Sequence, residues 1–140
     1  NLEKIVERTR KLGGTPVLIT SMERKAGVEH DTLMGYPQTV RDVAKERNCA
    51  LIDLNAMSRE FYKALGPELD KAFVDGTHHD NYGSYELAKY VVLGIERISL
   101  PLAKSIVDNF GKFDPAHPDA IATFAIPVSP GFSTEKPLGN

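Results

Sequence analysis

The chain has 140 residues, of which 41% are hydrophobic and 26% are charged, and its formal net charge is −2. This length suits a single domain of ordinary globular composition. The slightly acidic balance gives no reason to expect a nucleic acid or a membrane surface as a partner. No apolar run approaches the ~20 residues that span a bilayer. A single cysteine, Cys49, excludes an internal disulfide, and we expect it to be a buried bystander.

Helices and strands alternate along the first hundred residues. Apolar residues at helical spacing predict a helix over residues 1–12, and the run TPVLIT (15–20) predicts a strand covered on both faces. After a polar loop, a helix over 36–47 and a strand over 50–54 complete a parallel βαβ unit. Asn55 is the expected N-cap of a third helix. A fourth helix follows, and its Gly94 is expected to allow close approach to the sheet.

The number of strands is too small for the fold class that this pattern indicates. Inner strands of a parallel sheet need neighbours on both edges, and the predicted helices offer more apolar surface than two strands cover. We therefore expect a three-layer, flavodoxin-like α/β fold, with residues 1–100 as its C-terminal part. The missing N-terminal half, or another chain, would complete the sheet.

The last forty residues differ in character from the rest. Residues 101–140 hold six of the nine prolines. They are expected to form a short helix over 102–109 and then a proline-rich extended tail. Within this tail the sequence FDPAHPD is interpreted as a strap over the surface of the domain.

The stretch FVDGTHHDNYGSYELAKY (73–90) carries the candidate chemistry. Asp75 precedes His78 by three residues in a loop that leads into a helix. The carboxylate can therefore orient one ring nitrogen and leave the other free, which is the acid–histidine half of a nucleophilic hydrolase. The spacing also fits an alternative in which Asp75 caps a turn and His78 is simply exposed.

Other polar residues near this loop are weaker candidates. His79 is expected to face the solvent or to contact a substrate, and Tyr82 either stacks on a sugar ring or packs at the helix start. A metal site is not expected, because no third ligand lies at helical or strand spacing from the histidines. The run 23–25 is interpreted as a solvated group of charges rather than a sugar-binding site, and Ser84 as a helix-capping residue.

A family resemblance covers nearly the whole chain. The stretch DGTHHDNYGSYELAKYVV resembles the last motif of the SGNH (GDSL-like) hydrolases, in their rhamnogalacturonan acetylesterase-like branch. TPVLITSMERK resembles the family's fourth strand, and YPQTVRDVAKERNCALIDLNAMSREFYKALGPE resembles the helix, strand and helix before the motif. The proline-rich end resembles the tails of bacterial members.

This resemblance implies a serine acyl-transfer mechanism. Asp75 and His78 match the triad acid and base, and acetyl groups would be removed from pectic or related polysaccharides without a cofactor. The family's usual substrates suggest a secreted or periplasmic location.

The family's nucleophile and oxyanion motifs are missing from these 140 residues. The serine of a GDS-type motif and the G-x-N-D asparagine do not occur. A base without its nucleophile and oxyanion donors loses nearly all of its rate advantage. We therefore expect esterase activity from the parent protein and not from the isolated chain. The alternative is a non-catalytic α/β module, stabilised by oligomerisation or by a partner chain.

Overall fold

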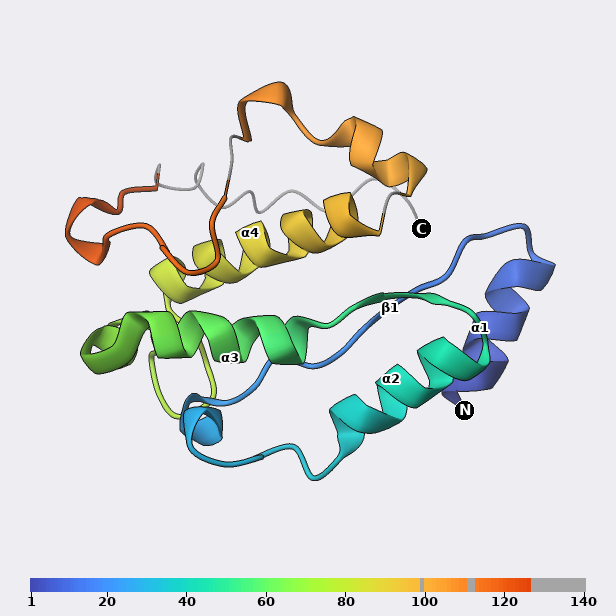
Figure 1. The fold of residues 1–140 in the computed structure, drawn as a ribbon, viewed down its shortest axis with the longest axis horizontal. Coiled ribbons are helices and arrows are strands. Elements are labelled where there is room, and N and C mark those ends of the chain that lie inside the picture. The colour runs from blue at the N-terminus through green and yellow to red at the C-terminus, as the bar shows by residue number, and fades with distance from the viewer. Residues whose placement is uncertain (99, 111–112, 127–140) are drawn as a thin grey trace, which may run out of the picture.

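Helices cover both faces of a two-stranded parallel sheet in the computed structural model, which describes residues 1–98, 100–110 and 113–126 (Figure 1). Strand β1 (Val17–Ile19) pairs with strand β2 (Ala50–Ile52), and Leu18 lies opposite Leu51. Helix α2 (Tyr36–Glu46) connects the two strands. The predicted βαβ unit with parallel strands is confirmed.

The remaining helices lie before and after this unit. They are α1 (Leu2–Lys11), α3 (Leu54–Leu65) and α4 (Asn81–Arg97). Shorter 3₁₀ turns are η1 (Lys25–Val28), η2 (Gly66–Ala72), η3 (Pro101–Ser105), η4 (Asp108–Phe110) and η5 (Ile121–Thr123). The short helix predicted over 102–109 is therefore replaced by two 3₁₀ turns. Among the described residues, no helix has both the length and the hydrophobicity to cross a bilayer.

The two faces of the sheet contact separate hydrophobic clusters, because successive strand residues point to opposite faces. The smaller cluster, with α1 and α2, consists of Val6, Leu18, Val43 and Ala44. The larger cluster consists of Ile52, Phe73 and residues of α3, η2 and α4: Met57, Phe61, Tyr62, Leu65, Ala72, Tyr82, Leu87 and Tyr90. This alternation is what places helices on both sides of a sheet of only two strands.

Helix α4 approaches the sheet closely at Gly94. A Cβ atom at this position would lie 2.6 Å from Cγ2 of Ile52. This contact is shorter than real Cβ atoms tolerate. A bulkier residue at position 94 would therefore prevent α4 from packing this closely on the sheet. The expectation for Gly94 is confirmed.

Two helix starts differ from the predicted ones. Asp53, and not Asn55, caps α3, because its carboxylate accepts a hydrogen bond from the N–H of Ala56. Asp80 caps α4 by accepting from the N–H of Gly83 at 2.8 Å, and Ser84 lies inside the helix. In both cases an aspartate slightly earlier in the chain takes the cap, since its side chain reaches the first free N–H groups.

The sheet is open at both edges in the part of the chain that the structure describes. Each strand pairs on one side with the other strand. Ile19 is 47% exposed, so β1 lacks the cover on both faces that its apolar sequence indicated. Exposed apolar side chains and unpaired backbone groups at a strand edge favour pairing with a further strand.

Residues 113–124, called the strap here, lie against α3 and α4 (orange to red in Figure 1). The hydroxyl of Tyr90 donates to the carbonyl of Pro115 at 2.7 Å. Lys89 of α4 forms an ion pair with Asp119 at 2.8 Å. The strap that the FDPAHPD sequence indicated is therefore confirmed for the described residues.

Candidate catalytic site

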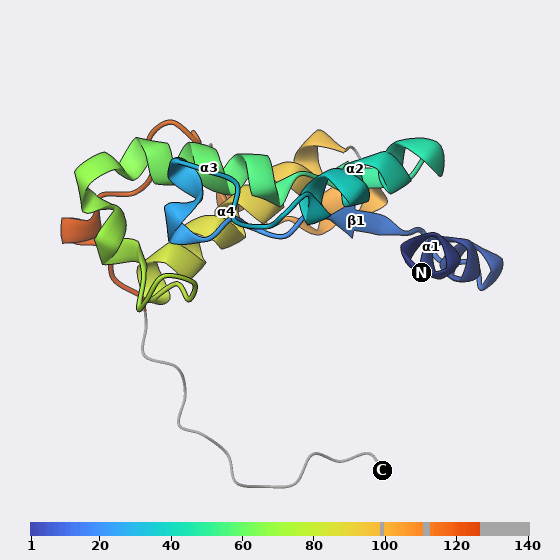
Figure 2. The same ribbon diagram turned by 90° about the horizontal axis from the view of Figure 1, so that it is seen from below.

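A short loop, residues 74–79, joins η2 to α4 and carries Asp75 and His78. Its two ends are paired, because Phe73 and His79 form an antiparallel bridge. The N–H of Lys25 donates to the carbonyl of Gly76 at 3.2 Å, which ties the loop to η1. The loop and η1 lie side by side in Figure 1, and Figure 2 shows that α1 is at the opposite end of the molecule. The loop is thus held next to the segment that follows β1.

The side chains of Asp75 and His78 face each other. Oδ2 of Asp75 is 2.8 Å from Nδ1 of His78, and its Oδ1 accepts from the N–H groups of Thr77 and His78, both at 2.7 Å. These bonds, above all the one from the backbone of His78, hold the pKa of the Asp75 carboxyl well below its usual range. An ionised carboxylate at Nδ1 favours the tautomer that leaves Nε2 free to accept a proton. The His78 side chain is 76% exposed, so its outer edge is open to solvent.

The same geometry recurs in the strap. Oδ2 of Asp114 is 2.7 Å from Nδ1 of His117, and its Oδ1 accepts from the N–H of Ala116 at 3.0 Å. The D-x-x-H spacing of this second pair is visible in the sequence, within the FDPAHPD run that was interpreted as a strap. Because aspartate readily bonds to backbone groups two or three residues later, the spacing itself produces this turn. The D-x-x-H spacing therefore brings an aspartate and a histidine together with or without a catalytic role.

His79 lies between aromatic residues of the core. Its ring packs on Phe73 with the centroids 4.1 Å apart, and Nε2 is 2.8 Å from the hydroxyl oxygen of Tyr62. Nδ1 is buried and has no hydrogen-bond partner among the described residues. The solvent-facing position predicted for His79 is wrong, because Phe73 and Tyr62 draw the ring inward. The contact of His79 with a substrate stays a prediction.

We expect His79 to make the folded chain less stable as the pH falls below about 6.5. Burial lowers the pKa of His79 in the folded state, so the unfolded chain takes up the proton first as the pH decreases. The loss is complete once the pH is below the folded-state pKa. Urea unfolding of the wild type and of His79→Gln at about pH 7.5 and about pH 5 isolates this contribution. Relative to His79→Gln, the wild type should have a lower free energy of unfolding at the lower pH than at the higher one. An equal difference between the two proteins at both pH values would contradict the prediction.

Tyr82 also belongs to the core. It is 3% exposed, its hydroxyl donates to the carbonyl of Asp119 at 2.7 Å, and its ring contacts Phe61 and Phe124. Burial raises the pKa of Tyr82 to about 12. This environment favours the packing alternative over stacking on a sugar ring.

Glu23 is buried although it belongs to a run of three charged residues. It is 1% exposed and accepts hydrogen bonds from the N–H of Arg24 at 2.9 Å and from the hydroxyl of Thr32, with Arg59 at 3.7 Å. Gly27 makes the space for it, since a Cβ atom there would lie 1.7 Å from Cγ of Glu23. The interpretation of residues 23–25 as solvated charges is therefore wrong for Glu23.

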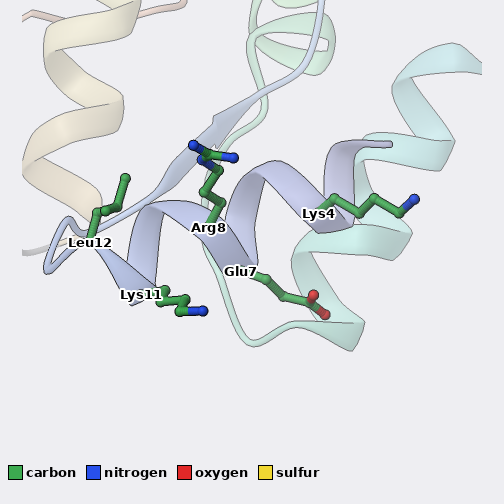
Figure 3. A pocket seen from close by; sticks show the side chains of 5 residues that line it. All are labelled: Lys4, Glu7, Arg8, Lys11 and Leu12. Atoms are coloured by element: carbon green, nitrogen blue, oxygen red, sulfur yellow. The ribbon is translucent and has the colours of Figure 1, made fainter.

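A shallow surface hollow along α1 lies far from the loop. It is lined by Lys4, Glu7, Arg8, Lys11 and Leu12 (Figure 3). These side chains spread in different directions and do not converge on a common point. In the ranges that the structure describes, no group of three or more His, Cys, Asp or Glu residues is placed to hold a metal ion.

The described residues define an α/β protein with a parallel sheet between helices and an exposed Asp–His pair before its last long helix. No protein-family model and no solved structure matches the chain. Rhamnogalacturonan acetylesterase RhgT of Bacillus subtilis (strain 168) is 35% identical, over 79% of this chain and 56% of the relative. The probable rhamnogalacturonan acetylesterase YesY of the same organism is 32% identical, over 76% of this chain and 54% of the relative.

The chain spans about half the length of these curated relatives. Over that length it is related to the rhamnogalacturonan acetylesterases, and the resemblance found in the sequence is confirmed.

Proposed function

We propose that this chain is the C-terminal part of an SGNH-type serine ester hydrolase that removes acetyl groups from a rhamnogalacturonan-type polysaccharide. Both matched relatives carry the name rhamnogalacturonan acetylesterase, one of them as probable. The observation that carries the proposal is the 2.8 Å contact between Oδ2 of Asp75 and Nδ1 of His78, with the imidazole exposed. Nothing in this mechanism requires a cofactor.

The position of this pair favours it over the second pair at Asp114 and His117. Its loop is hydrogen-bonded to η1, which follows the carboxyl end of β1. Open α/β sheets bind their ligands beyond the carboxyl ends of the strands. His117 belongs instead to the strap, against the helices.

In the proposed reaction, Nε2 of His78 accepts the proton of a serine hydroxyl as the serine oxygen attacks the acetyl carbonyl. The histidine then gives this proton to the departing sugar oxygen, and a water molecule repeats the cycle to release acetate. Asp75 holds the ring and stabilises the imidazolium. The serine and the oxyanion donors would come from the N-terminal half of the domain, or from another chain that pairs with the open sheet.

The isolated 140-residue chain is expected to give no burst of p-nitrophenol from p-nitrophenyl acetate. The reason is that it holds the proposed base and acid without a nucleophile motif. Stopped-flow absorbance measures the burst. A burst that disappears in His78→Ala would show that the chain contains its own nucleophile.

The proposal is tested with the full-length product of the reading frame that contains this chain. Acetate release from acetylated rhamnogalacturonan is expected, with little release from the deacetylated polymer. A folded full-length product without deacetylase activity would overturn the proposal. It would favour the alternative of a non-catalytic module stabilised by oligomerisation or by a partner.

A further inference from the structure

The exposed His78 ring depends on its loop for its position. Its recorded side-chain partner is Asp75, and both residues belong to the same exposed turn. The two ends of the loop are held together. Val74 donates its N–H to the carbonyl of His78 at 2.8 Å, and His79 pairs with Phe73. The residue after His78 is therefore the place where the loop meets the core.

A directed chain of hydrogen bonds leads from this place into the core. Tyr62 of α3 is 1% exposed, and its hydroxyl donates to the carbonyl of Glu23 at 2.7 Å. Burial raises the pKa of Tyr62, so the hydroxyl keeps its proton. Because a hydroxyl has one proton, the 2.8 Å contact between Tyr62 and Nε2 of His79 is made with the proton of His79.

These two hydrogen bonds join three parts of the fold that are distant in the sequence. Glu23 follows β1, Tyr62 lies near the end of α3, and His79 lies just before the start of α4. Glu23 is itself fixed, since its N–H donates to the hydroxyl oxygen of Ser58 at 2.9 Å. The hydroxyl of Tyr62 is thus a rigid point to which the loop is tied.

We propose that Tyr62 is a positioning residue for the reaction, which acts through His79 to fix the direction of the His78 imidazole. Successive side chains of an extended segment point to opposite sides. With the His79 ring held inward between Tyr62 and Phe73, the His78 ring is directed outward. This inference rests on the proposed function, because it assigns His78 the role of base.

The test compares Tyr62→Phe with Tyr90→Phe in the full-length enzyme. Both changes remove one buried hydroxyl that donates to a backbone carbonyl, but the partner of Tyr90 is Pro115 in the strap. We expect kcat for polysaccharide deacetylation to fall roughly tenfold in Tyr62→Phe with KM nearly unchanged, since a misplaced catalytic group costs up to ~10²-fold. In Tyr90→Phe, kcat should stay within about twofold of the wild type.

Two changes at His79 complete the test. His79→Gln keeps an N–H donor for the Tyr62 hydroxyl and should retain most of kcat, whereas His79→Leu should lose as much as Tyr62→Phe. Hydrogen exchange of residues 74–79, followed by mass spectrometry, should be faster in Tyr62→Phe than in Tyr90→Phe. This measurement does not depend on activity.

Equal kcat values for Tyr62→Phe and Tyr90→Phe, with His78→Ala inactive, would overturn the inference and leave the proposed function standing. Full activity of His78→Ala would overturn the assignment of His78 as the base and, with it, the role of Tyr62 in catalysis, whereas an inactive wild type would overturn the proposed function itself. The exchange measurement would still show whether Tyr62 holds the loop.

Discussion

The His78→Ala variant of the full-length enzyme is expected to lose at least about 10³-fold in kcat/KM for acetate release. In the proposed reaction, the variant has no group at this position to accept the serine proton or to return it to the sugar oxygen. Binding of the polysaccharide should change little, so the loss should be in kcat. Initial rates of acetate release over a range of polymer concentrations separate the two quantities.

The strap supplies a matched control for this experiment. His117 makes the same contact to an aspartate three residues earlier, and both rings are exposed. His117→Ala should stay within about twofold of the wild type, as expected for a surface change away from the chemistry. A large loss in His117→Ala, with activity retained in His78→Ala, would assign the base to the strap.

The Gly83→Ala variant is expected to destabilise the folded chain by about 1–3 kcal/mol. A Cβ atom at position 83 would lie 2.2 Å from the carbonyl oxygen of Ala72 and 2.9 Å from Cδ2 of His79. The atom in the way is the backbone carbonyl oxygen of Ala72 at the end of η2, which cannot move aside as a flexible side chain does. The clash outweighs the ~1 kcal/mol that alanine gains over glycine inside a helix. Urea unfolding followed by circular dichroism measures the change.

Gly76 gives the comparison for Gly83, because it lies in the loop just before α4 and a Cβ atom there would meet nothing within 4 Å. Gly76→Ala should change the free energy of unfolding by less than about 0.5 kcal/mol. If both variants unfold at the same urea concentration, the close contact between α4 and η2 is not what holds the loop.

Local patterns were sufficient to predict several elements from the sequence. The parallel pairing of β1 and β2 follows from two short apolar runs separated by one helix, and Gly94 stands out as a small residue on the apolar face of α4. The contact between Asp75 and His78 was also predictable, because three residues of chain bring the two side chains together. In each of these cases the determining residues are close in the sequence or repeat with a regular period.

The misplaced residues depend on contacts that are distant in the sequence. Glu23 is buried with two groups of α3 beside it: Arg59 faces its carboxylate and the hydroxyl of Tyr62 donates to its carbonyl. His79 turns inward because the hydroxyl of Tyr62, on α3, contacts its ring nitrogen. No periodic pattern marks either contact. The second Asp–His pair, in contrast, was visible in the sequence and shows that this spacing forms a turn with or without a catalytic role.

The strap has a practical consequence for any shortened form of the protein. Lys89 is covered by the strap, with its Nζ atom 4.6 Å from the centre of the Phe113 ring and paired with both Glu86 and Asp119. Glu86 is fully buried, and burial raises the pKa of its carboxyl. Truncation after α4 would expose this carboxylate and the neighbouring aromatic rings to solvent. Exposed aromatic surface favours aggregation. An expressible fragment should therefore extend beyond Phe124.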